Sequence, residues 1–181
     1  FKLFNDGNKS PLALDLAGGF AVGTWSERND VWQKDVIRLG KSTLDRPADL
    51  IGILAHELSH QLLLGEGRIN ADCFDNELLT DLTAVFHGFG VFLANNPRKS
   101  TGQLAHWPGT RLYMPEYLSE PMFGYAMAHI AWFRDEPKPT WAKALRWVPR
   151  AVFKEGLRYL QETADSTFQP VRLRTGRKGQ D

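Results

Sequence analysis

The sequence lacks the features that mark several large classes of protein. It has a single cysteine, Cys73, so no internal disulfide can form and an oxidising compartment is not required. Its 22 basic and 21 acidic residues leave a net charge of +1, which gives no reason to expect nucleic acid as a partner. No apolar run is long and clean enough to span a bilayer. We therefore expect a cytoplasmic protein that binds neither nucleic acid nor a membrane.

The length and composition fit one globular domain. The 181 residues are 43% apolar and 24% charged, and a chain of this size can bury a core of its own. There is no internal repeat and no low-complexity linker. We expect a single domain over residues 1–171 and a mobile basic tail over 172–181. Because the chain begins at Phe1 and not at Met, we expect it to be an excerpt or a processed product.

The pattern of residues predicts strands first and helices afterwards. Residues 18–25 and 30–39 are rich in β-branched and aromatic side chains, and the polar SERN segment between them suits a hairpin. Helical patterns follow at 48–64, 76–95, 120–136 and 139–165, the last broken at Pro149, with loops at 66–75 and 98–115. The predicted fold class is α+β, with a small antiparallel or mixed N-terminal sheet followed by four to five helices.

One helical segment carries the sequence His56-Glu57-Leu58-Ser59-His60. Two histidines four residues apart lie on one face of a helix, one turn apart, so their ring nitrogens can bind a single ion. Glu57 lies beside them but is angled away from direct ligation. In this H-E-x-x-H arrangement the histidines hold zinc, and the glutamate takes a proton from a water whose pKa the metal lowers to about 7.

The alternative to a metal site is that both histidines are core residues bonded to the backbone and that Glu57 is solvated. Apolar neighbours predict a largely buried helix: Leu54, Ala55, Leu58 and Leu62. Burying a carboxylate and two imidazoles without partners costs several kcal/mol. A metal ion is the simplest compensation, so we favour a metal site.

A third protein ligand is needed if water is to hold the fourth position on zinc. Glu77 and Asp81 lie one turn apart on the next predicted helix, and the small residues Ala84 and Gly88 continue that face. We expect Glu77 to ligate and Asp81 to accept the outer N–H of a ligating histidine. A solvated helix start would explain Glu77, since acidic residues favour helix N-termini, but would not explain Asp81, which lies deeper among leucines.

Three other residues remain candidates for the third zinc ligand. Asp81 could ligate with Glu77 in support. Glu66 lies six residues beyond His60, although Leu63 stands where the extended histidine motif has a bend-making glycine. Cys73 is a soft ligand in a predicted loop.

The motif from His56 to His60, followed by Glu77 and Asp81, resembles the gluzincin branch of the zincin metallopeptidases. In those enzymes the third zinc ligand is a glutamate on a later helix, and an aspartate four residues after it supports a zinc-binding histidine. The sequence is also similar to uncharacterised bacterial proteins with an H-E-L-x-H helix. The match covers His56 to Asp81, and the separation of His60 from Glu77 is shorter than in thermolysin-like enzymes. The resemblance implies a small sheet ahead of the motif helix, whose edge strand pairs with an extended peptide. Residues 30–39 could serve that role.

Two further residues are candidates for stabilising an oxyanion. Tyr125 and His129 share a helix face at a spacing of four, and in enzymes of this kind a tyrosine or histidine from the C-terminal part often has this role. The alternative, which we favour for both, is an aromatic packing face.

The sequence thus predicts a zinc metallopeptidase that cleaves a peptide or protein substrate. Zinc is held by His56, His60 and Glu77, and Glu57 is the general base. One rival is an amidase or deformylase-type hydrolase. The other is an inactive or regulatory zincin-fold module with structural zinc, which the intact Glu57 argues against. The sequence does not fix the substrate sequence or the oligomeric state.

Overall fold

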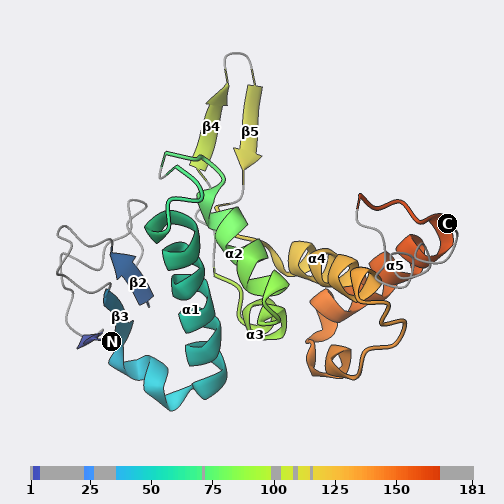
Figure 1. Cartoon of the computed structure of the whole chain (residues 1–181), viewed down its shortest axis with the longest axis horizontal. Helices are drawn as coiled ribbons and strands as arrows, with labels where there is room; N and C mark the ends of the chain where they lie inside the picture. The colour runs from blue at the N-terminus through green and yellow to red at the C-terminus, as the bar shows by residue number, and fades with distance from the viewer. Residues whose placement is uncertain are drawn as a thin grey trace, which may run out of the picture.

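Helices dominate the part of the chain that the structure describes (Figure 1). The computed structural model describes the following residues: 2–4, 23–26, 36–70, 72–98, 103–107, 110–114 and 116–167. The tail predicted over 172–181 lies outside these ranges. Within them, no helix is both long enough and apolar enough to cross a membrane.

Three short strands precede the first helix. The central strand β3 (Val36–Gly40) pairs in parallel with β1 (Lys2–Phe4) and antiparallel with β2 (Gly23–Ser26). β2 and β3 overlap the later parts of the two strands predicted at 18–25 and 30–39, whereas most of the expected SERN turn lies outside the described residues. β1 was not predicted, because three residues are too few to show an alternating pattern. A 3₁₀ turn, η2 (Lys41–Asp45), leads from β3 to the first helix.

Helix α1 (Pro47–His60) carries the H-E-x-x-H motif and continues into a π-helical turn, η3 (Gln61–Gly65). Pro47 occupies the first turn, where its missing N–H costs nothing, and Asp49 follows it where acidic residues favour the helix dipole. In the π-helical turn the Glu66 N–H donates to the Gln61 carbonyl, five residues back, at 3.1 Å. The sheet lies on one side of α1 and the next helix on the other (Figure 1).

The single helix predicted over 76–95 is two helices, so that prediction is wrong. α2 (Asn76–Phe86) ends before a turn, and α3 (Gly90–Asn95) follows. Gly88 lies in this turn with φ of +94°, a conformation that glycine adopts at little cost. Gly88 is exposed and does not continue a packing face, contrary to expectation. Gly52 of α1 faces α3 instead, although a Cβ there would make only an ordinary van der Waals contact, 3.5 Å from the Phe92 backbone.

The loop predicted over 98–115 contains an antiparallel hairpin, which corrects that prediction. β4 (Gln103–Trp107) pairs with β5 (Thr110–Met114), with Gln103 opposite Met114. The dipeptide Pro108-Gly109 between the strands is a turn signal that the sequence analysis did not use. The hairpin projects away from the helices (Figure 1).

The C-terminal part is a helix pair. α4 (Glu120–Phe133) is followed by a 3₁₀ turn, η4 (Thr140–Ala144), and by α5 (Trp147–Thr163). The predicted break at Pro149 is wrong: Pro149 lies in the first turn of α5, where a helix has no intrahelical acceptor for its N–H. The apolar core joins α4 and α5 to α2 and α3, and its largest buried side chains include Phe123, Leu145 and Leu160.

Candidate metal centre

The polar residues of the motif lie on the buried face of α1. His56, Glu57 and His60 are 1%, 2% and 8% exposed, whereas Leu58, between them in sequence, is 52% exposed. The helix therefore turns its titratable groups towards α2 and one of its leucines outwards. Such an arrangement is costly unless each buried polar group has a partner.

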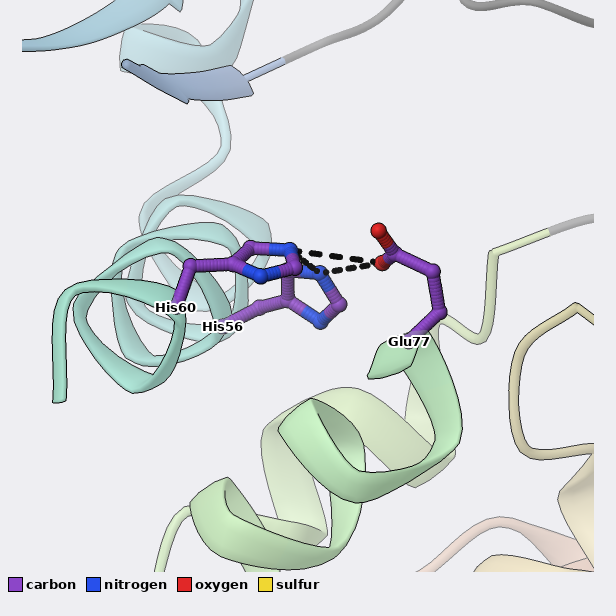
Figure 2. Close-up of side chains that lie close together, drawn as sticks. All are labelled: His56, His60 and Glu77. Atoms are coloured by element: carbon purple, nitrogen blue, oxygen red, sulfur yellow. Dashed lines mark hydrogen bonds and ion pairs between the residues drawn. The ribbon is translucent and has the colours of Figure 1, made fainter. Parts of the chain in front are cut away.

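Three potential ligand atoms meet between α1 and α2 (Figure 2). The Nε2 atoms of His56 and His60 are 3.0 Å apart. The Oε2 atom of Glu77, from the first turn of α2, lies 3.1 Å from the Nε2 of His56 and 3.3 Å from that of His60. Within the described ranges, these are the residues whose ligand atoms cluster closely enough to hold one ion.

The other nitrogen of each histidine is engaged by α2. His56 Nδ1 lies 2.8 Å from Asp81 Oδ1, and His60 Nδ1 lies 3.2 Å from Thr80 Oγ1. The Thr80 hydroxyl donates its single proton to the Asn76 carbonyl at 2.8 Å, so it can only accept from His60. The hydrogen-bond network thus assigns the proton of each neutral imidazole to Nδ1.

This assignment leaves three lone-pair atoms facing one another. Both Nε2 atoms of the neutral imidazoles are then acceptors, and the Glu77 carboxylate is an acceptor as well. Acceptors at 3.0–3.3 Å repel unless protons or a cation lie between them. Ligands about 2.1 Å from a tetrahedral zinc are roughly 3.4 Å from one another, close to the distances seen here. The donor set and its spacing therefore fit a zinc ion with an open fourth position.

The charges of the metal-free site respond to the same contacts. Burial and the Arg98 charge lower the pKa of His56, but Asp81 and Glu77 outweigh them and raise it overall. Burial acts to raise the pKa of Glu77, yet its contacts with His56 and His60 lower it far below the usual range. Without a metal, a proton on an imidazole can thus take the place of the cation.

Asp81 connects the site to the segment that leads into α4. Its Oδ1 contacts His56, and its Oδ2 accepts the Leu118 backbone N–H at 3.0 Å, two residues before α4 begins. The carboxylate is 2% exposed. Both its oxygens are therefore held, and the ring orientation of His56 is fixed by a rigid partner.

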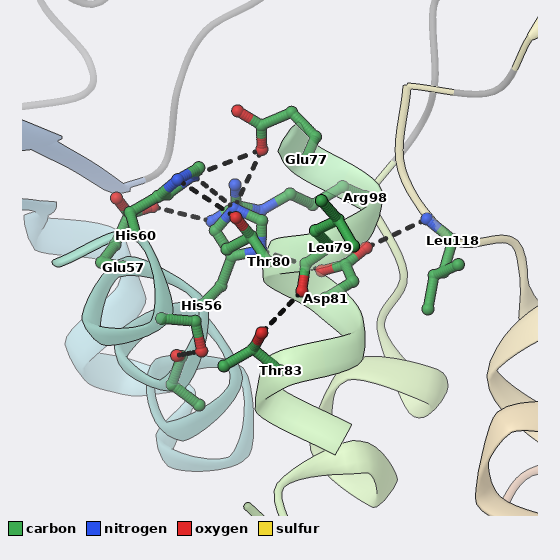
Figure 3. A network of polar contacts seen from close by, with 12 residues as sticks. His56, Glu57, His60, Glu77, Leu79, Thr80, Asp81, Thr83, Arg98 and Leu118 are labelled. Atoms are coloured by element: carbon green, nitrogen blue, oxygen red, sulfur yellow. Dashed lines mark hydrogen bonds and ion pairs between the residues drawn. The ribbon is translucent and has the colours of Figure 1, made fainter. Parts of the chain in front are cut away.

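Glu57 pairs with an arginine that the sequence analysis did not identify. Arg98 Nη2 donates to Glu57 Oε1 at 2.9 Å, and Figure 3 shows the side chain extending towards Glu57 and the histidines. The Arg98 guanidinium carbon lies 5.4 Å from the centre of the Tyr117 ring, which is itself 5.9 Å from the His56 ring. Burial, and after it the Glu77 charge, raises the pKa of Tyr117. Neither Arg98 nor Tyr117 has a sequence spacing from the H-E-x-x-H motif that would have predicted its place in the site.

Two alternative third ligands have other partners. Glu66 is exposed and accepts two hydrogen bonds from Arg68, at 2.8 and 3.0 Å. The Cys73 thiol donates to Asp75 Oδ1 at 2.8 Å, and this contact raises its pKa. Asp81 contacts the Nδ1 face of His56 and not the Nε2 cluster. Of the four candidates, Glu77 is the one that the structure brings to both histidines.

Tyr125 and His129 are not brought to this cluster. Their rings meet edge to face on α4, 4.7 Å apart. A Cβ on Gly156 of α5 would lie 2.9 Å from the Tyr125 ring, and His129 Nδ1 lies 3.3 Å from Ser166 Oγ. Burial lowers the pKa of His129, with Asp165 opposing it. These contacts favour the packing alternative, and the oxyanion role stays a prediction without support from them.

A cavity of about 270 Å³ lies behind the cluster, between α1 and α3. Its lining includes His56, Asp81 and Arg98 of the site, further polar residues such as Asp49, and apolar ones such as Phe92. Comparison with known proteins adds no assignment, because no family model, curated protein or solved structure matches this chain. Function must therefore be argued from the site.

Proposed function

We propose that this chain is a zinc-dependent hydrolase, and specifically a metallopeptidase of the zincin type. The observation that carries the proposal is the meeting of His56 Nε2, His60 Nε2 and Glu77 Oε2 within 3.3 Å of one another. Hydrogen bonds at the far side of each imidazole turn these lone pairs inwards. That donor set, two neutral imidazoles and one carboxylate, is the one that zinc peptidases use.

When bound, zinc supplies Lewis acidity and makes a nucleophilic water available near neutral pH. His56, His60 and Glu77 would hold it, while Asp81 and Thr80 keep the two imidazoles in the required tautomer. Glu57 has no ligand contact, although it is buried beside both histidines. We assign it the role of general base, which takes a proton from the attacking water and passes it to the leaving amine.

The ion pair between Glu57 and Arg98 favours a second candidate, a zincin-fold module that binds a peptide without cleaving it. In such a module the zinc is structural, and the glutamate is kept as the partner of a part-buried arginine. An amidase or deformylase-type enzyme would use the same residues on another carbonyl substrate. No observation in the described residues favours that third possibility.

Metal analysis together with a Glu57→Gln variant tests the proposal. The purified chain should hold about one zinc ion, and Glu57→Gln should retain it because Glu57 is not a ligand. Hydrolysis of a mixed peptide library should disappear in the variant. Equal cleavage by both proteins would remove the peptidase proposal. Zinc and peptide binding by both, with cleavage by neither, would favour the module.

A further inference from the structure

Arg98 combines contact with a buried carboxylate and access to solvent. Its Nη2 atom donates to Glu57 Oε1 at 2.9 Å, yet the Arg98 side chain is 29% exposed and that of Glu57 only 2%. The arginine belongs to the segment after α3, whereas Glu57 belongs to α1 (Figure 3). Of the two partners of this ion pair, Arg98 is therefore the one whose side chain is more accessible to a ligand.

The contact conflicts with the role proposed for Glu57. A general base must offer a carboxylate oxygen to the attacking water within hydrogen-bond reach. Here one of the two oxygens of Glu57 is taken by Arg98, whose charge also acts to lower the pKa of His56. Both oxygens of Glu57 are free for the attacking water only when Arg98 has another partner during the reaction.

The chemistry of Arg98 indicates what that partner is. A guanidinium has five N–H donors in a planar fork that matches a carboxylate, and it does not lose its charge near neutral pH. Tyr117 lies against it, with the guanidinium carbon 5.4 Å from the ring centre, so the cation has a support that does not depend on Glu57. Arg98 also lines the cavity of about 270 Å³, which gives its side chain room to move.

We propose that Arg98 binds a carboxylate of the substrate and that this carboxylate displaces Glu57 from the guanidinium, which frees the base. The inference rests on the proposed peptidase function and narrows its substrates. They are peptides with a carboxylate close to the scissile bond, either a free C-terminus or an acidic side chain. One ion pair replaces another at Arg98, and the freed Glu57 carboxylate can then accept a hydrogen bond from the attacking water.

The kinetic test uses the zinc-loaded full chain and one hexapeptide library made in four forms. Two forms have a C-terminal acid or amide, and two amidated forms carry Glu or Gln at each position in turn. The wild type should cleave the carboxylate-bearing forms with a kcat/KM about ten- to a hundredfold higher, the size expected for one hydrogen bond to a charged group. The acid and amide forms test recognition of a free C-terminus, and the Glu and Gln forms test recognition of an acidic side chain.

Variants at position 98 separate this role from a structural one. In Arg98→Gln the ratio of kcat/KM between carboxylate and neutral peptides should fall to near one, with zinc content unchanged. Arg98→Lys should keep part of the preference, because it retains the charge but not the fork. Arg68→Gln is the matched control, since Arg68 pairs with the exposed Glu66 in the same way. An Arg98→Gln enzyme that keeps the wild-type preference would overturn the inference.

A binding measurement distinguishes failure of this inference from failure of the proposed function. The Nε–H signal of Arg98 in a ¹⁵N spectrum, identified by its absence in Arg98→Gln, is followed while acetyl-dialanine or its amide is added to the zinc-loaded chain. The acid alone should shift the signal. If it does so and no peptide is cleaved, the carboxylate site stands and the peptidase proposal fails. If peptides are cleaved, but the acid does not shift the signal and the carboxylate forms are cleaved no faster than the neutral forms, Arg98 does not bind a substrate carboxylate.

Discussion

Two helices of this chain carry the same pair geometry in different surroundings. His56 and His60 on α1, and Tyr125 and His129 on α4, are each four residues apart with ring centroids 4.7 Å from one another. The rings are close to perpendicular in both pairs, at 80° and 89°. Helical spacing brings the two rings of each pair together, and because both pairs share this geometry it cannot by itself distinguish a metal site from a packing face.

The neighbouring helix makes the difference. α2 faces the first pair with Glu77, Thr80 and Asp81, which bind both nitrogens of each ring. α5 faces the second pair with Gly156, whose missing side chain lets the Tyr125 ring approach closely. The polar partner creates a place for a cation, and the small partner creates a close helix contact. The residues of the facing helix therefore determine whether a ring pair can bind a cation or only packs.

Removing one ring of the polar pair should have the largest effect. His60→Ala leaves two ligands for zinc, so we expect the zinc affinity to fall by more than about a hundredfold, beyond the loss typical of a residue that only supports a ligand. Competition with a chromogenic chelator measures it. The matched change in the other pair, His129→Ala, should leave zinc affinity unchanged. Equal losses in both variants would remove the distinction between the two pairs.

Removing the support behind a ring should have a smaller effect. Asp81→Asn keeps the size of the side chain but takes away the charge that His56 Nδ1–H faces at 2.8 Å. We expect zinc affinity to fall about ten- to a hundredfold, as for other losses of this kind. Thermal unfolding of the metal-free variant provides a control for the lost Leu118 contact. A larger loss for Asp81→Asn than for Glu77→Gln would exchange their roles.

The pH dependence should reveal proton and metal competing for one place. The pKa of His56 is raised, so its proton stabilises the metal-free fold at low pH, and this stabilisation is lost as pH rises through the raised pKa. Zinc needs the imidazole without that proton, so its affinity should fall about tenfold per pH unit below the same pKa. The zinc-induced rise in Tm should therefore grow from pH 6 to pH 8. A rise that shrinks over this range would contradict the assignment of His56 as a ligand.

The sequence was sufficient to locate the first helix and the three residues whose ligand atoms cluster, His56, His60 and Glu77. His56, Glu57 and His60 follow from spacing within one helix, and Glu77 and Asp81 from the same spacing on the next. Local rules carry that far because a helix fixes which side chains share a face. The prediction of a mostly buried helix was less accurate, since Leu58 is exposed while the charged motif residues are buried.

Other features depend on contacts that spacing does not encode. Arg98 reaches Glu57 across 41 residues, and Tyr117 reaches the site from the segment before α4. No periodic pattern marks such residues. The helix break at Gly88 and the continuity of α5 through Pro149 were missed for another reason: glycine and proline act according to their position within a turn, which a boundary error of a few residues reverses. The prediction that residues 30–39 form a free sheet edge for a peptide is wrong in the described part, because β3 is the central strand and pairs with β1 on one side and β2 on the other. The rest of that stretch lies outside the described residues.

The smallest effect is expected where the packing pair is changed. His129→Ala removes an edge-to-face contact with Tyr125 and a hydrogen bond to Ser166, so we expect a loss of roughly 0.5–1.5 kcal/mol in the free energy of unfolding. Zinc content and the rate of peptide hydrolysis per folded molecule should not change, because this ring contacts Tyr125 on α4 and Ser166 in the segment after α5. Urea unfolding measures the first quantity and a peptide assay the second. A fall in kcat of a hundredfold or more, as for loss of an oxyanion donor, would return His129 to the catalytic site and make the two ring pairs parts of one centre.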